Sequence, residues 1–272
     1  MLQGISGAYW VLQKKSAPGI VFRETGRTIR DVEEYIRKIK FYLPDMSRLY
    51  ENGDVDYYPR RILYAFNSPC GLCEYRSLCI EGDLSGYIIG YSAIEAGHGK
   101  LFVSPSDVIK YETCPRQWAY YKSGVKSPFS SAASECGSCL HKGIEEFLLN
   151  GDDPVRVFEQ EWMERKDAAT ITYNQKDTHQ GLLEIGMKLM SQFPDKWRET
   201  GLEVCNVERT VRIDLGDFCL KGRPDIVATK DCNLYVIDWK FTAVSFSDDW
   251  VAKSDQMTAY AALLFLSEEV FA

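Results

Sequence analysis

Asp225, Asp238 and Lys240 all fall in the segment GRPDIVATKDCNLYVIDWKF, residues 222–241. Alternation along a strand places Asp238 and Lys240 on one face and Trp239 on the other. A hairpin between this strand and the strand that Asp225 opens would bring Asp225 beside them. A surface ion pair is the plain alternative for any single D-x-K. The matching position of Asp225 favours a site over that alternative.

This set of side chains has a definite chemical use. Two carboxylates can hold Mg²⁺ or Mn²⁺, which prefer hard oxygen ligands. Such a cation neutralises a phosphodiester and lowers the pKa of a water molecule. Lys240 could orient that water or stabilise the charge that develops on the phosphate. The pattern therefore predicts metal-dependent phosphodiester hydrolysis.

A second group of chemically active residues is the cysteine trio in CGLCEYRSLC, residues 70–79. Cys70, Cys73 and Cys79 have the spacing C-x2-C-x5-C. Metal centres built from cysteine usually need four ligands, so a fourth ligand must come from elsewhere. Spacing alone leaves both a zinc site and an iron-sulfur cluster open.

Cysteine usage also bears on the compartment. The chain has nine cysteines, an odd number, and MLQGISGAYWVLQKK at its start lacks the features of an export signal. We therefore expect a reducing, cytoplasmic environment, with metal ligation in place of a disulfide framework. No apolar run reaches the roughly 18 residues of a membrane span. No membrane association is expected.

The hydrophobic pattern predicts the elements that must position these residues. Apolar residues recurring every three to four positions predict helices at residues 28–43, 104–124, 135–150, 155–165, 177–200 and 254–267. Alternating runs predict strands at residues 8–14, 19–23, 205–215, 218–230 and 234–243, with a further candidate in 86–92. The class is mixed α/β with a small central sheet.

The net charge narrows the function classes. A formal charge of -7 argues against a protein that coats nucleic acid passively, because such proteins tend to be basic. It leaves room for an enzyme with acidic metal ligands and a local basic groove.

The motifs, taken in order, resemble those of the PD-(D/E)XK nuclease superfamily. Pro224-Asp225 followed by Asp238-Trp239-Lys240 is similar to its signature. CLHKGIEEFL, residues 139–148, resembles the helix with a metal-binding histidine in the RecB-like branch. QMTAYAALL, residues 256–264, resembles the Q-x-x-x-Y motif after the D-x-K strand. SPSDVIKYETCPRQWAYY, from residue 104, resembles the first helix of the iron-sulfur members, which include AddB-type and CRISPR-associated RecB-like nucleases.

The resemblance implies a fold and a set of roles. The fold would be a restriction-endonuclease-like core, a central mixed sheet flanked by helices, with an iron-sulfur-bearing helical subdomain. The implied metal ligands for Mg²⁺ or Mn²⁺ are His141, Asp225 and Asp238, with the Trp239 carbonyl. Lys240 would position or activate the attacking water. The implied supports of the active site and the DNA end are Gln256 and Tyr260. Without the other motifs, a lone helical histidine is more often structural than a ligand.

The resemblance also implies the fourth cysteine ligand. In the iron-sulfur branch one cysteine lies in the first helix before a proline, as Cys114 does before Pro115. Cys70, Cys73, Cys79 and Cys114 would then hold a 4Fe-4S cluster with a structural role, and a four-cysteine zinc site is the chemical alternative.

The other cysteines have plainer interpretations. Cys136 and Cys139 form another C-x-x-C, which could bind zinc or act as a redox pair, but their place in the His141 helix favours a structural role. Cys205, Cys219 and Cys232 fall in or near predicted strands, so we expect small core residues.

The order of the motifs differs from the family. The cysteine trio precedes the nuclease motifs here, and residues 1–80 resemble what the family carries after residue 272. We therefore expect a circular permutation, with residues 1–81 as the permuted C-terminal part, 82–103 as a linker and 104–272 as the nuclease core, in one structural domain. Residues 1–80 as an independent module are the alternative.

The expected function is a metal-dependent DNA exonuclease acting on single-stranded or frayed ends in recombination, repair or DNA-fragment processing. A second interpretation is a DNA-binding scaffold, the partner of a helicase or an integrase, with weak or no cleavage. A third is a zinc-stabilised DNA-binding protein. The sequence leaves the oligomeric state, the polarity and RNA cleavage open.

Overall fold

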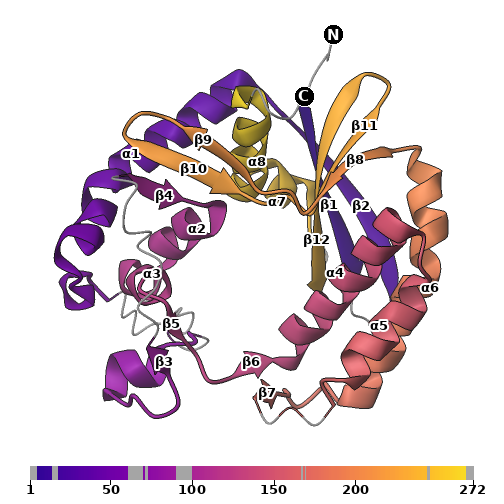
Figure 1. Cartoon of the computed structure of the whole chain (residues 1–272), viewed down its shortest axis with the longest axis horizontal. Coiled ribbons are helices and arrows are strands. Elements are labelled where there is room, and N and C mark those ends of the chain that lie inside the picture. The colour runs from indigo at the N-terminus through magenta and orange to yellow at the C-terminus, as the bar shows by residue number, and fades with distance from the viewer. Residues whose placement is uncertain are drawn as a thin grey trace. The chain divides into compact units, whose positions relative to one another are not determined.

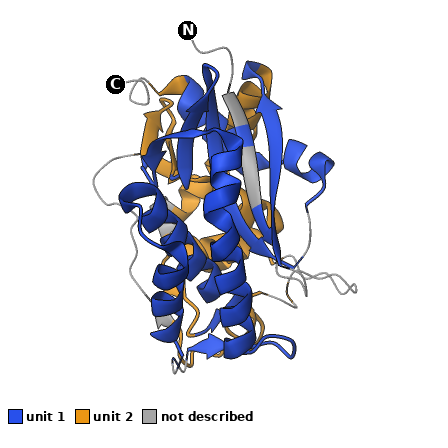
Figure 2. Ribbon diagram, turned by 90° about the vertical axis from the view of Figure 1, so that its right-hand side faces the viewer, with its two compact units in different colours: residues 1–29, 129–210, 223–265 blue, residues 30–128, 211–222, 266–272 orange. Residues whose placement is uncertain are grey.

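The computed structural model describes residues 5–13, 18–60, 70, 73–89, 100–166, 168, 170–243 and 246–267. The chain divides into two compact units. Unit 1 comprises residues 1–29, 129–210 and 223–265, and unit 2 comprises residues 30–128, 211–222 and 266–272 (Figure 2). Each unit therefore combines segments that are far apart in the sequence. The domain boundaries expected from the sequence stay a prediction.

Unit 1 is built on a five-stranded sheet in the order β2-β1-β12-β11-β8 (Figure 1). Its strands are β1 (Ile5–Gln13), β2 (Gly19–Arg27), β8 (Glu203–Val207), β11 (Ile226–Lys230) and β12 (Asn233–Thr242). β1 runs parallel to β12, and the other neighbours are antiparallel. The sheet is therefore mixed, as expected, and residues 5–27 contribute two of its strands.

Helices cover both faces of this sheet. α4 (Ala132–Asn150), α5 (Pro154–Met163) and α6 (His179–Thr200) form a hydrophobic core with Ile226, Ile237 and Trp239. α8 (Asp255–Leu266) packs against the other face. A Cβ at Gly7 of β1 would lie 2.9 Å from Sδ of Met257, so glycine permits this close approach. Strand alternation then turns Trp239 into the core and leaves Asp238 on the α8 side.

Unit 1 also holds three short elements. They are β6 (Ser130–Ser131), β7 (Ile171–Thr172) and α7 (Asp248–Ala252). β6 pairs with β7 in parallel, just before α4 begins. Ser131 then caps α4 by accepting a hydrogen bond from the backbone N–H of Ser134.

The described part of unit 2 contains helices and two small sheets. Its main helices are α1 (Ile29–Asn52), which begins at the boundary with unit 1, α2 (Pro105–Thr113) and α3 (Pro115–Lys122). Two single-turn helices lie at Val55–Tyr57 and Ser77–Glu81. The strands β4 (Leu101–Val103), β10 (Phe218–Gly222) and β9 (Val211–Asp214) form one sheet, and β3 (Ile88–Ile89) pairs with β5 (Val125–Lys126).

Two strands expected to be continuous are each broken. The run 205–215 divides into β8 and β9, and the run 218–230 divides into β10 and β11, with the two halves in different sheets. At the first break Glu208 has a φ of 50°, which a regular strand does not allow. At the second break Pro224 has no N–H for a strand ladder. The expectation was therefore wrong for two of the three long strands, for these local reasons, and the third, expected at 234–243, is present as β12.

Two predicted helices also differ. The helix expected at 104–124 ends at Cys114, whose φ of -163° and ψ of 114° are extended, and α3 restarts at Pro115. The residue before proline disfavours the α region, which explains the break. In contrast, α1 continues through Pro44 to Asn52. Met46 and Leu49 are fully buried, and their burial offsets the hydrogen bond that the proline removes.

The longest described helix, α1, has 24 residues and carries charged side chains along its length. Within the described ranges, no helix combines the length and hydropathy needed to cross a membrane.

Candidate active site

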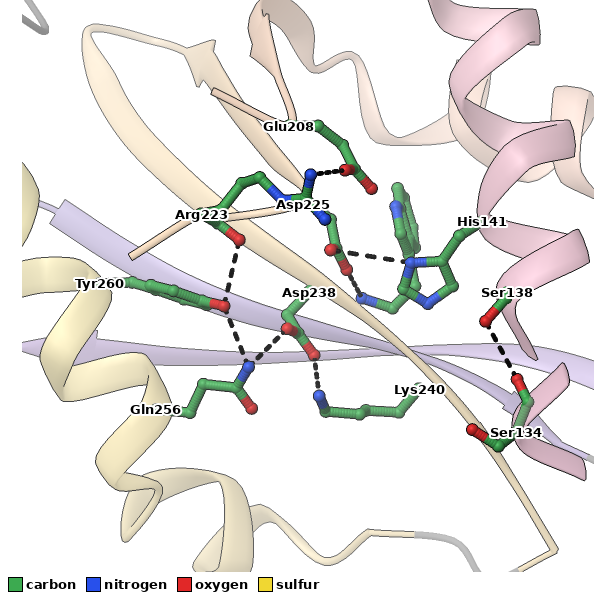
Figure 3. A network of polar contacts seen from close by, with 11 residues as sticks. Ser134, Ser138, His141, Glu208, Arg223, Asp225, Asp238, Lys240, Gln256 and Tyr260 are labelled. Carbon is green, nitrogen blue, oxygen red and sulfur yellow. Dashed lines mark hydrogen bonds and ion pairs between the residues drawn. The ribbon is translucent and has the colours of Figure 1, made fainter. Parts of the chain in front are cut away.

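Asp238 and Lys240 project from β12 into the same space (Figure 3). Nζ of Lys240 lies 2.5 Å from Oδ2 of Asp238, whose side chain is 4 % exposed. Trp239 between them is buried in the core with the helices. The alternation predicted for D-x-K therefore holds, and it gives a buried carboxylate in contact with an ammonium group.

Asp225 precedes β11 and faces the same space. Ile226 pairs with Ile237, so Asp225 comes opposite Asp238 in the hairpin. The backbone N–H of Trp239 donates to Oδ2 of Asp225 at 2.7 Å. Burial raises the pKa of Asp225 well above its usual range, and the charge of Asp238 raises it further. The two carboxylates therefore repel each other when both are ionised.

His141 enters from α4, one turn beyond Ser138 (Figure 3). Its Nδ1 lies 3.7 Å from Oδ1 of Asp225, which is too long for a hydrogen bond. Burial lowers the pKa of His141, although the charge of Asp238 partly opposes this. The ring is thus held in the neutral form that can bind a metal.

Glu208 and Arg223 complete the group, and the motifs did not identify either. Oε2 of Glu208 lies 3.2 Å from Nη1 of Arg223. The backbone N–H of Glu208 donates to the carbonyl of Asp225 at 2.9 Å, which holds this residue in its left-handed conformation. The sequence offers no local signal for Glu208, because the alternating pattern runs through residues 208–210 without a break. Its position opposite Asp225 depends on sheet pairing and could not be deduced locally.

Gln256 and Tyr260 on α8 brace the site from the opposite side. Nε2 of Gln256 donates to Oδ1 of Asp238 at 2.8 Å and to Oη of Tyr260 at 3.0 Å. Oη of Tyr260 donates to the carbonyl of Arg223 at 3.3 Å. This relay, visible in Figure 3, ties β12 to the segment before β11 through one face of α8.

The donor atoms of this group suit a divalent cation. One ligand atom each from His141, Glu208 and Asp225 lies within 4.8 Å of the other two. In the described part of the chain, the buried Oδ2 of Asp238 accepts no hydrogen bond of normal geometry. Carboxylate oxygens suit Mg²⁺ and Mn²⁺, and the imidazole favours Mn²⁺ of the two. His141, Glu208 and Asp225 can therefore hold such a cation, and Asp238 lies opposite Asp225.

The four cysteines of the expected cluster lie together in unit 2. Cys70, Cys73, Cys79 and Cys114 all line one cavity, together with Arg60, Arg76 and Arg116. Burial raises the pKa of Cys73 and Cys79, and the charges of Arg60 and Arg116 oppose this at Cys79. The charges of Arg60 and Arg116 therefore favour negative charge on the sulfur of Cys79.

The remaining cysteines partly differ from expectation. Cys136 and Cys139 are fully buried in α4, as a structural role requires. Cys205 and Cys232 are exposed and Cys219 is half-buried, so the expectation of core residues was wrong. Cys205 lies on the edge strand β8, and Cys232 has a φ of 59° in the β11–β12 turn.

Comparison with known proteins agrees with the geometry. A family model described as the PD-(D/E)XK nuclease superfamily matches residues 103–270, more than half of the chain. The chain belongs to the PD-(D/E)XK nuclease superfamily. No curated protein and no solved structure matches it.

Membership of the superfamily implies a metal-dependent phosphodiesterase with a nucleic-acid substrate. The candidate metal group of His141, Glu208 and Asp225 accords with that activity. The mixed sheets flanked by helices are consistent with a PD-(D/E)XK core.

Proposed function

We propose that this nuclease degrades DNA from single-stranded or frayed ends and belongs to the RecB-like branch. The observation that carries the proposal is the convergence of Asp225, Asp238, Lys240 and His141 on one space. The motifs around His141 and around Gln256 and Tyr260 support the RecB-like branch, and the preference for single-stranded ends follows from that resemblance.

Each side chain has a defined task in hydrolysis. When bound, a divalent cation would neutralise the phosphodiester and acidify a water molecule. Lys240 orients the attacking water or stabilises the charge that develops on the phosphate. Gln256 holds Oδ1 of Asp238, so a cation would approach Oδ2, which now contacts Lys240. The neutral ring of His141 offers a nitrogen to the metal, and the Trp239 carbonyl is a further candidate ligand.

Linear and circular single-stranded DNA of the same sequence distinguish the modes of action. With Mn²⁺ or Mg²⁺, an exonuclease shortens an end-labelled linear strand and leaves the circle intact, and the label end gives the polarity. Cleavage of the circle would show endonuclease action. Binding of either DNA without cleavage under any metal would favour a scaffold that partners a helicase or an integrase.

We also propose that Cys70, Cys73, Cys79 and Cys114 hold a 4Fe-4S cluster. Their shared cavity and the three arginines that line it support this assignment, because four thiolates leave the whole cluster negatively charged. The cluster would tie the segment after α1 to the break between α2 and α3. Metal analysis of the purified protein separates the alternatives: iron with sulfide supports the cluster, and stoichiometric zinc supports a four-cysteine zinc site.

A circular permutation of the family order is the third part of the proposal. It is supported by β1 and β2, which extend the sheet beside β12 through nine parallel residue pairs, from Ile5 with Leu234 to Gln13 with Thr242. The end-to-end distance that would test it involves residues 1–4 and 268–272, which lie outside the described residues. A rearranged gene that begins at residue 104 and joins residue 272 to residue 1 should fold and retain cleavage.

A further inference from the structure

The side chain of Arg223 is exposed enough to exchange its ion-pair partner, Glu208, for another anion. Its guanidinium is paired with Glu208 at 3.2 Å, while its side chain is 62 % exposed. Exposed ion pairs of this kind contribute little, so exchange of one anion for another costs little. The backbone of Arg223 is held in place, because its carbonyl accepts a hydrogen bond from Tyr260 and because the following Pro224 restricts its conformation.

Glu208, the ion-pair partner of Arg223, is also a candidate ligand of the cation. Glu208 offers an oxygen within 4.8 Å of the ligand atoms of His141 and Asp225. A cation held there competes with the guanidinium for the same carboxylate, because both are attracted to its charge. Loading of the cation therefore weakens the ion pair and frees the guanidinium donors.

The freed guanidinium faces a space large enough for a substrate group. Arg223, Glu208 and His141 line one cavity of about 430 Å³, together with Ser134, Ser138 and Phe241. Figure 3 shows the two serines on the same side of α4 as His141. A volume in the range of small-molecule pockets can admit one nucleotide unit of a strand.

We propose that Arg223 binds a backbone phosphate of the substrate and exchanges Glu208 for it when the cation is bound. The proposal rests on the proposed nuclease function. Arginine suits this role because its planar fork can donate two parallel hydrogen bonds to a phosphate, and it is charged at every working pH. Arg223 is thus a substrate-binding residue whose availability depends on the metal.

A DNA-binding measurement without turnover tests the exchange. The probe is a fluorescein-labelled oligothymidylate, followed by anisotropy with no added divalent cation. Glu208→Gln should bind it roughly threefold to tenfold more tightly than wild type, because the guanidinium is released. In the double variant Glu208→Gln/Arg223→Gln this gain should disappear.

The same probe in Ca²⁺ tests the loaded site. Arg223→Gln should bind about fivefold more weakly than wild type, and the slope of log affinity against log salt should fall by about 0.7, as for one lost phosphate contact. Arg223→Lys should recover only part of the affinity, because lysine keeps the positive charge but cannot donate two parallel hydrogen bonds to a phosphate.

Calorimetric titration with Mn²⁺ in the absence of DNA separates binding from a structural role. Arg223→Gln should bind Mn²⁺ roughly threefold to tenfold more tightly, because a positive charge beside the cation has been removed. If Arg223 served only to hold Glu208 in place, the same variant would bind Mn²⁺ more weakly.

The matched control is Arg198→Gln, which removes an exposed arginine paired with Asp195 at 2.6 Å on α6. This control should have the wild-type affinity for the labelled oligothymidylate and for Mn²⁺. The proposal is overturned if Arg223→Gln behaves like this control toward DNA, or if it weakens Mn²⁺ binding. Failure of the nuclease function would appear separately, as a wild type that does not cleave DNA in Mn²⁺.

Discussion

Asp225 meets two opposing demands. Its carboxylate must be charged to hold a cation, yet burial and the neighbouring Asp238 raise its pKa well above the usual range. A carboxyl whose pKa is higher in the folded protein stabilises the fold only while it is protonated. Without metal, its contribution to the free energy of unfolding therefore falls as the pH rises from about 3.9 through the folded-state pKa.

Asp225→Asn should remove this penalty. The amide oxygen can still accept the hydrogen bond from the N–H of Trp239, and no charge is buried. We expect the metal-free variant to be more stable at neutral pH by on the order of 1 kcal/mol, with a flatter pH dependence, and to have lost cleavage. Thermal unfolding between pH 5 and pH 8, with and without Mn²⁺, measures this.

Two results would contradict that account of Asp225. One is an unfolding temperature that depends on pH identically in the wild type and the variant. The other is an equal stabilisation of both proteins by Mn²⁺, because the wild type alone retains all the proposed carboxylate ligands.

At the residue scale, the sequence predicts some of the side chains that share the site but not all of them. Asp238 and Lys240 could be placed together because strand alternation is a local rule. The sequence did not predict Glu208 as a site residue, because its position depends on pairing with Asp225 before β11, seventeen residues further along the chain.

At the scale of elements, α5 and α6 pack closely through a glycine. A Cβ at Gly186 of α6 would overlap the ring of Phe158 on α5, which is fully buried. α6 in turn supports the face of the sheet that carries Trp239. The spacing between these helices therefore depends on the absence of a side chain at position 186.

Gly186→Ala should destabilise unit 1 by about 1–3 kcal/mol, the usual cost of overpacking a core. Gly137→Ala in α4 is the control, because its Cβ would meet only Phe241 at an ordinary 3.6 Å. Chemical denaturation followed by tryptophan fluorescence compares the two. Equal midpoints for Gly186→Ala and wild type would show that the helices can move apart at little cost.

The elements themselves were predictable where their signals are local. The helices α4 and α6 follow from apolar periodicity, and the capping box of Ser104 with Asp107 is present at the start of α2. The breaks at Pro115 and Pro224 also have local causes, but periodicity alone runs through them. The division of the broken strands between two sheets required long-range pairing that the sequence pattern does not contain.

At the scale of the whole molecule, the chain forms two units from interleaved segments. Residues 211–222 belong to unit 2, although the segments on both sides of them carry active-site residues of unit 1. No shift in composition marks the points where the chain passes from one unit to the other, so the sequence pattern suggests one domain. Each unit has its own candidate centre, the carboxylate group in unit 1 and the cysteine group in unit 2.

Cys114→Ser should therefore affect unit 2 first. We expect iron to fall from about four per chain to a minor fraction and proteolysis to increase within residues 30–128, because metal binding and folding are coupled. Cys205→Ser, an exposed cysteine on β8, is the control and should keep its iron. Full iron content in Cys114→Ser would remove Cys114 from the ligand set.

Lys240 and its carboxylate neighbours are the groups to which we assign phosphodiester hydrolysis. The most direct test is cleavage of end-labelled single-stranded DNA by wild type and Lys240→Ala, with Mg²⁺, with Mn²⁺ and with chelator. Lys188→Ala, an exposed lysine on α6, serves as the matched control. We expect metal-dependent cleavage that falls by roughly 10²- to 10³-fold in Lys240→Ala alone, with DNA binding largely retained. Cleavage by Lys240→Ala at the wild-type rate, or undiminished cleavage in chelator, would contradict it.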